Sequence, residues 1–293
     1  MATNTLEVIT MIARESLRLL RNEMNFVANI NHSYDKEWDN RGGAEIGSQL
    51  KIRIPNNYTV GSGATITTES TIDEVVVLPR ATQKWVAVEF TSEELTQHID
   101  DSGVRQRVLK PAMSNLAAAI QSDCFSMVKD VYNSVGTPGT TPAGMTWALN
   151  AGRKLDESLA PQSDRVLIMN PAAQVSMVNA LSSLYNSSRE VSNQYLTGRM
   201  KNALGFDWYS NPQIPVLTTG SDHGTVTING ANQTGSTLVI AGANLKYGDS
   251  FTIADVYAVH PKTKTAYDYL QEFTVLADGT TSISISPSII TSG

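Results

Sequence analysis

The sequence contains a single cysteine, Cys124, so no internal disulfide can form. Such a chain fits a reducing compartment like the cytoplasm in which it is made. It also lacks any apolar run of transmembrane length. Charged side chains interrupt residues 1–24 at regular intervals, which excludes the apolar centre of a secretory signal. These absences argue against a membrane protein and against a secreted domain held together by disulfides.

Charge is scarce as well. Charged residues make up 17% of the chain, and 22 basic against 28 acidic residues give a net charge of -6. Proteins that grip nucleic acid through its phosphates need clustered Lys and Arg, and this sequence has no such cluster. A container for DNA is a different case, because it only has to enclose its cargo. Hydrophobic residues make up 41% of the chain, so a packed interior is feasible.

Catalytic motifs are missing too. The four histidines, His32, His98, His223 and His260, are not spaced as metal ligands, and there is no HExxH sequence. Neither a phosphate-binding glycine loop nor a Gly-x-Ser-x-Gly turn occurs. Cys124 falls on an apolar helical stripe, where a buried inert thiol is expected. We therefore expect no enzyme activity, no cofactor and no metal site.

The N-terminal region reads as an amphipathic helical arm. Apolar residues recur at helical spacing from Leu6 to Val27, and Arg14, Arg18 and Arg21 occupy the opposite face. Such a helix either lies on a neighbouring subunit or covers its own domain. The pattern does not choose between the two.

A long hairpin is expected next, over residues 46–90. Apolar residues alternate with Lys51 and Arg53 in residues 50–54, which predicts a half-buried strand. A turn-rich segment and a second valine-rich limb follow. Because a hairpin this long has little core of its own, it needs cover from elsewhere, and sibling copies are the natural cover.

The rest of the chain predicts an α+β fold. A long helix is expected over residues 104–135, with a kink at Pro111. A helix over 146–159, a strand over 165–169 and a helix opened by Asn170 and Pro171 form an α/β unit. Short strands with turn signals then predict a small barrel or sandwich. These strands are expected at residues 225–228, 237–240, 250–254, 273–276 and 282–286.

The order of these features resembles the coat proteins of tailed bacteriophages with the Hong Kong ninety-seven capsid fold. More narrowly, it is similar to the Salmonella podovirus (P twenty-two) coat family, which carries a β-barrel inserted in that fold. The resemblance is carried by segments spread along the chain. They are residues 104–110 with their Ala-rich continuation, Trp147-Ala148, Asn170-Pro171, residues 203–207 (ALGFD) with 214–218 (IPVLT), and residues 245–253 (LKYGDSFTI) with 273–275 and 284–287.

The resemblance implies a domain plan. It consists of an N-terminal arm (1–45), an extended hairpin or E-loop (46–90), a peripheral domain with a spine helix (91–140), an apical domain (141–217) and an inserted barrel (218–293). In the family the fold returns after the barrel to complete the apical and peripheral domains. That part is expected to be absent from this sequence, and the barrel turn at residues 229–236 is shorter than the long loop of the podovirus barrel.

The implied function is a major capsid protein that self-assembles into an icosahedral shell around phage DNA. Its expected partners are further copies in hexamers and pentamers, a scaffolding protein and a portal protein, with no membrane involved and no sequence-specific contact with the double-stranded DNA. The shell would assemble in the host cytoplasm. Lys51 and Arg53 on the hairpin, with Arg14, Arg18 and Arg21 on the arm, are the expected subunit-interface residues. The alternative is a phage tail or receptor-binding structural protein, and a hydrolase ranks last.

Overall fold

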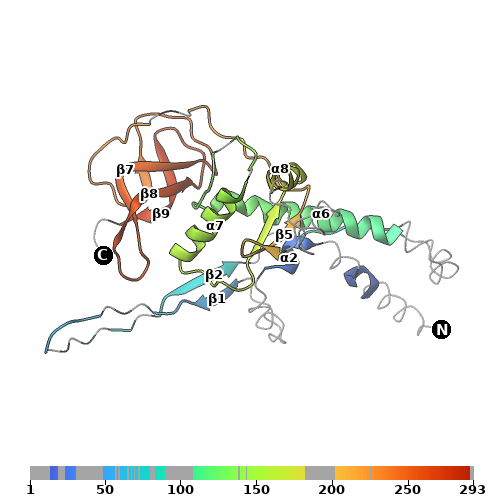
Figure 1. Ribbon diagram of the computed structural model, residues 1–293, viewed down its shortest axis with the longest axis horizontal. Helices are drawn as coiled ribbons and strands as arrows, with labels where there is room; N and C mark the ends of the chain where they lie inside the picture. Colours follow the sequence, from blue (N-terminus) through green and yellow to red (C-terminus); the bar gives the residue numbers. More distant parts are fainter. Residues whose placement is uncertain are drawn as a thin grey trace. The chain divides into compact units, whose positions relative to one another are not determined.

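A computed structural model of the 293-residue chain is shown in Figure 1. The structure describes residues 14–18, 24–30, 49–56, 58, 60–64, 66, 68, 70–71, 73–79, 83–89, 108–137, 139–142, 144–181, 202–222, 224 and 226–290. The chain divides into two compact units, which are described separately. One unit is Ile30–Glu89, and the other combines Met1–Asn29 with Phe90–Gly293.

The smaller unit contains the hairpin. Strand β1 (Gln49–Arg53) pairs antiparallel with β2 (Val75–Pro79), so that Lys51 lies opposite Val77 and Arg53 opposite Val75. Beyond the strands, the Tyr58 hydroxyl lies 3.2 Å from the Thr71 Oγ1, which keeps the two limbs close. Residues 83–89 belong to no strand, so the paired part of the expected second limb ends at Pro79, before Val86 and Val88. Phe90, its expected end, lies outside the described residues.

The N-terminal helix is interrupted. Residues 14–18 are helical, and a separate short helix α2 spans Asn25–Ala28. Met24, just before α2, is buried and has a non-helical backbone (φ -99, ψ 87), so the single helix expected from Leu6 to Val27 is wrong at this point. The break accompanies an edge-on contact between the rings of Phe26 and Phe125, whose centroids are 5.1 Å apart.

The expected long helix is shorter than its apolar stripe. Helix α6 spans Lys110–Ser126 and continues as a 3-10 turn, η2 (Met127–Asp130), after which residues 131–135 are not helical. Pro111 is the second residue of α6 and follows directly on residues 108–109, which form a π-helical turn. The kink expected at Pro111 stays a prediction. The early end has a tertiary cause. The Thr274 hydroxyl donates to the Lys129 carbonyl, and Tyr247 donates to the Asp130 carboxylate at 2.6 Å.

An α/β unit follows. It comprises α7 (Met145–Glu157), β3 (Val166–Met169), α8 (Pro171–Leu181), β4 (Asn202–Ala203) and β5 (Phe206–Ser210). Strands β3 and β5 are parallel, and β4 pairs antiparallel with β5. The Asn170 side chain accepts a hydrogen bond from the Ala173 N–H and so caps α8, as the Asn-Pro pair predicted. The helices and strands share one core of Ala148, Met169, Ala173, Met177, Phe206 and Trp208.

The C-terminal part is an antiparallel sheet of four strands in the order β6-β9-β8-β7. Figure 1 labels β7, β8 and β9 in this sheet. The strands are β6 (Gly235–Val239), β7 (Ser250–Val259), β8 (Ala266–Val275) and β9 (Ser282–Ile289). Residues 225–228, expected as a strand, contribute only an isolated bridge from Ile228 to Ile240 among the described residues. The ladders of the described strands leave β6 and β7 at the two ends of the sheet, so they do not close the expected barrel. Phe273 and Val275 lie at the centre of the core of this sheet.

The whole is therefore a mixed helix and sheet fold. Within the described residues, no helix is both long enough and apolar enough to cross a bilayer. The domain boundaries given by the resemblance stay predictions.

Candidate subunit interface

The β1–β2 hairpin presents two different faces. Residues that lie directly opposite in an antiparallel pair project on the same side. The register therefore puts Lys51 and Arg53 on one face together with Val77 and Val75. Ile52 lies on the other face, opposite Val76. The two cations predicted as interface residues thus share one face with the aliphatic side chains of Val75 and Val77 on the neighbouring strand.

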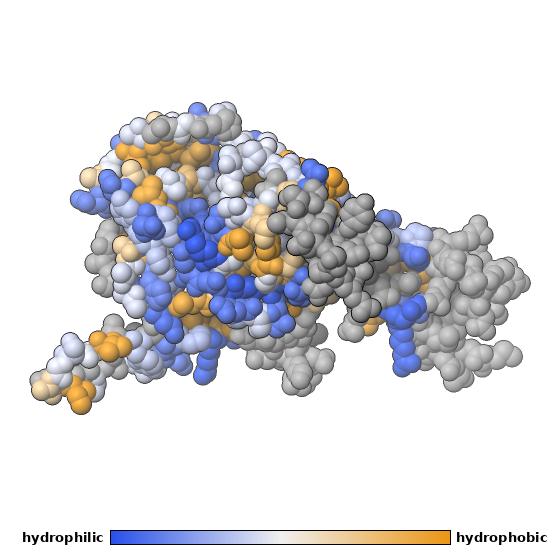
Figure 2. All heavy atoms as spheres, viewed as in Figure 1, coloured by the Kyte–Doolittle hydropathy of each residue, from blue (hydrophilic) through white to orange (hydrophobic). Residues whose placement is uncertain are grey.

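Apolar exposure is the hairpin's most unusual property. The four residues Val75 to Leu78 are each between 41% and 50% exposed, although together they form a strand of high β propensity. Further along, Val60 is 99% and Ile66 90% exposed, and Figure 2 shows apolar surface at the far end of the hairpin. Covering one such side chain fully is worth roughly 1.5–3 kcal/mol. A neighbour that covers several of them gains substantial free energy.

The charges on the hairpin contribute less. Arg53 lies 3.8 Å from the Asp73 carboxylate, with both side chains mostly exposed (81% and 63%). A pair this open and this long is worth on the order of 0–1 kcal/mol and is screened by salt. Lys51 is exposed on the same face. The cationic face is thus partly neutralised by its own chain, which the sequence pattern did not reveal.

The arginines of the arm differ from one another. Arg14 is exposed on the helical segment 14–18. Arg18 is engaged by Glu15: its Nε and terminal nitrogen donate to the two carboxylate oxygens at 3.0 and 2.6 Å. These hydrogen bonds, with the attraction of the Glu15 charge, raise the pKa of Arg18 above its ordinary value. Arg21 lies outside the described residues.

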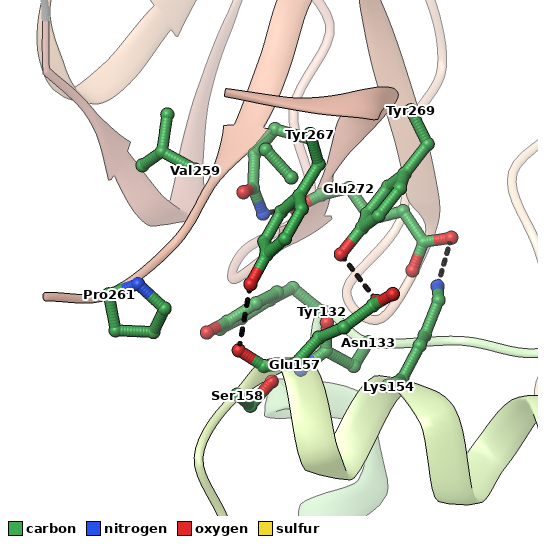
Figure 3. Close-up of a pocket in the computed structure, with 12 residues that line it drawn as sticks. Tyr132, Asn133, Lys154, Glu157, Ser158, Val259, Pro261, Tyr267, Tyr269 and Glu272 are labelled. Atoms are coloured by element: carbon green, nitrogen blue, oxygen red, sulfur yellow. Dashed lines mark hydrogen bonds and ion pairs between the residues drawn. The ribbon is translucent and has the colours of Figure 1, made fainter. Parts of the chain in front are cut away.

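A polar junction, which sequence reasoning missed, joins α7 to the C-terminal sheet (Figure 3). The Lys154 ammonium lies 2.6 Å from a Glu272 oxygen and also donates to the Ser134 carbonyl, while the Ser134 N–H donates to the other Glu272 oxygen at 2.8 Å. Both charged side chains are mostly buried, at 16% and 23% exposure. This arrangement anchors the sheet to the helix.

Two tyrosines complete the junction. The Tyr269 hydroxyl donates to the Glu157 carboxylate at 2.8 Å, and the Tyr267 hydroxyl donates to the Glu157 carbonyl at 3.2 Å. Their rings stack with centroids 5.3 Å apart. Burial, together with the hydrogen bond to Glu157, raises the pKa of Tyr269 well above its ordinary value. These groups line a cleft of about 160 Å³, and the hydroxyls of Tyr267 and Tyr269 already have protein partners.

Possible metal ligands, histidine and cysteine are the groups on which chemistry at a site would depend. In this part of the chain, no group of three or more His, Cys, Asp or Glu side chains could hold a metal ion. His260 has a structural role, because its Nδ1 accepts the N–H groups of Lys262 and Thr263 in the turn between β7 and β8. Burial raises the pKa of the Cys124 thiol, which lowers its reactivity.

Comparison with known proteins decides the family. The model of the family described as "P22 coat protein - gene protein 5" matches residues 1–292. The chain belongs to the P22 coat protein family. It is a structural major capsid protein, and its family places it in the oligomeric shell of the virion.

Other comparisons of this coat protein add little. No curated protein matches it. A solved structure from Mycobacterium phage Che8 is similar over 66% of this chain and 70% of that chain, with 18% sequence identity and a TM-score of 0.48. The family assignment replaces the tail or receptor-binding alternative. The roles of Lys51, Arg53, Arg14, Arg18 and Arg21 in subunit contacts stay predictions.

Proposed function

We propose that this coat protein self-assembles, through its hairpin, into an icosahedral shell of hexamers and pentamers that encloses phage DNA. The single observation that carries the proposal is the apolar exposure of the hairpin, from the β2 strand to Val60 and Ile66. A two-stranded ribbon of this kind is at best marginal alone, and a neighbouring copy that overlaps it would cover both strands.

The remaining parts of the proposal follow from charge and composition. A net charge of -6 without a basic cluster suits a wall that encloses double-stranded DNA and does not bind its sequence. Scaffolding and portal proteins would act as assembly partners in the host cytoplasm. The helical segment with Arg14 and Arg18 would lie against a neighbouring subunit or against a scaffold.

Lys51 and Arg53 are proposed to orient the hairpin on acidic groups of the neighbour, while the apolar residues supply most of the contact energy. Electrostatic groups at an interface mainly set register and association rate. Because Asp73 partly neutralises Arg53, Lys51 contributes more than Arg53 to the orientation of the hairpin on its neighbour.

The test is a double charge reversal, Lys51→Glu with Arg53→Glu, in the full chain. We expect a folded subunit with an unchanged far-UV spectrum but few or no closed particles in negative-stain electron micrographs, with the gene products encoded beside it co-expressed. The matched control reverses two exposed lysines in the β7–β8 turn, Lys262→Glu with Lys264→Glu, and should form normal particles. Normal particles from the hairpin double variant would refute the proposed role of these cations.

A further inference from the structure

The outer edge of β2 carries backbone groups that the hairpin itself does not use. The Ile54 N–H donates to the Glu74 carbonyl at 2.9 Å, which identifies that pair as hydrogen-bonded. Bonded and non-bonded pairs alternate in an antiparallel ladder. The N–H and C=O groups of Val75 and Val77 therefore point away from β1. Pro79, at the end of the strand, also falls at an outward position, where a residue without an N–H leaves the ladder intact.

A second segment of the same unit has the composition of a strand but pairs with no strand among the described residues. Residues 83–89 (QKWVAVE) are exposed and belong to no helix or strand, and no strand pairing involves them among the described residues. Trp85 is 78% exposed, and Val86 and Val88 are each 39% exposed. Aromatic and β-branched residues at this density favour a strand. The segment is long enough to cover the five residues of β2.

Charge order fixes the direction in which these two segments can pair. Glu74 precedes β2 and Arg80 follows it, while Lys84 precedes the apolar run of the second segment and Glu89 follows it. A parallel pairing sets opposite charges side by side at both ends. An antiparallel pairing sets Glu74 near Glu89 and Arg80 near Lys84, and like charges across strands are destabilising.

Parallel pairing cannot occur within one chain. Only residues 80–82 separate Pro79 from the second segment, and a parallel connection needs a crossover of roughly a dozen residues or more. A fold-back over so short a link would be antiparallel, which the charges oppose. A second copy of this chain supplies a partner segment with the required charge order.

We propose that the outer edge of β2 receives residues 83–89 of a neighbouring copy as a parallel strand, which turns the two-stranded ribbon into a three-stranded sheet across the subunit interface. The added strand uses the outward N–H groups of Val75 and Val77 and covers the exposed apolar side chains on both segments. This inference rests on the proposed role of the hairpin in subunit contacts. To that proposed interface it adds which segment of the neighbouring copy pairs with β2 and in which direction the segment runs.

The test is cysteine crosslinking in assembled particles. One protein carries Val75→Cys, and a differently tagged protein carries either Trp85→Cys or Glu89→Cys. The two are co-assembled and treated with a short bismaleimide. A parallel strand brings position 75 next to 85 and leaves it about 13 Å from 89, because four residues of strand span that length. Wild-type particles, which keep Cys124, give the background.

We expect a crosslinked product that carries both tags from the 75 and 85 pair, and little from the 75 and 89 pair. A dominant 75–89 product, between chains or within one, would overturn the parallel pairing, as would particles that form but give no product above background. If a cysteine variant does not assemble, the neighbouring position Val76 or Val86 takes its place. The two failures are distinguishable, because normal particles from the Lys51 and Arg53 reversal would refute the role of those cations, whereas the crosslinks report only the pairing of β2 with residues 83–89.

Discussion

Replacing Lys154 by methionine should measurably destabilise the coat subunit, because this side chain joins α7 to the C-terminal sheet. The ammonium lies 2.6 Å from a Glu272 oxygen and also donates to a carbonyl, and both charged side chains are mostly buried. A hydrogen bond to a charged group contributes about 1.5–3 kcal/mol. Methionine keeps most of the apolar stem, so the loss is chiefly electrostatic. We expect the free energy of unfolding to fall by about 2 kcal/mol.

The neighbouring residue on α7 supplies the control. Arg153 lies 3.5 Å from Glu157 but is 58% exposed, so Arg153→Met should change the free energy of unfolding by less than about 1 kcal/mol. Urea unfolding followed by tryptophan fluorescence measures both variants, because Trp147 and Trp208 report on the adjoining α/β core. Equal losses for the two variants would refute the reasoning that burial, and not the presence of a cation, sets the strength of the junction.

Two further predictions concern the core and the tyrosines. Met177 is fully buried and Val175, on the same helix, is 70% exposed. Urea titrations should therefore show that the free energy of unfolding falls by about 2–5 kcal/mol in Met177→Ala and by less than about 0.5 kcal/mol in Val175→Ala. Similar losses for the two variants would contradict the core assignment. The pKa of Tyr269 is raised by burial and by its bond to Glu157, and the pKa of Tyr247 by its bond to Asp130. Their stabilising contribution is therefore complete below the unfolded pKa of about 10 and declines as pH rises above it. Because Tyr269→Phe removes this titration, the urea midpoint of the variant should fall less steeply than that of the wild type between about pH 9 and pH 11, on either side of the unfolded pKa. An unchanged slope would contradict this assignment.

Local patterns in the sequence were sufficient for several elements. The alternation around Lys51 and Arg53 predicted the strand that the structure has at Gln49–Arg53, and the Asn170-Pro171 pair predicted the start of α8. These signals are local, because side-chain periodicity and capping depend only on neighbouring residues.

The missed features have tertiary causes. The apolar stripe after Ser126 continues in the sequence, yet the helix ends because Lys129 and Asp130 are bound by residues of the C-terminal sheet. Strand β8 begins at Ala266, earlier than its apolar pattern indicated, since its first half pairs with the irregular second half of β7. The Tyr267-x-Tyr269 repeat was the one local signal of the junction. Its partners on α7 are more than one hundred residues away, and no pattern in the sequence links them.

The run of three valines and a leucine in β2 also makes the unassembled subunit prone to aggregate. A short, uncharged segment of high β propensity beside an open strand edge is the composition from which cross-β fibrils grow. Ordered growth of a particle and disordered stacking therefore compete for the same residues. The concentration of subunits not yet incorporated then decides the yield, and slow supply or early capture by a companion protein favours the particle.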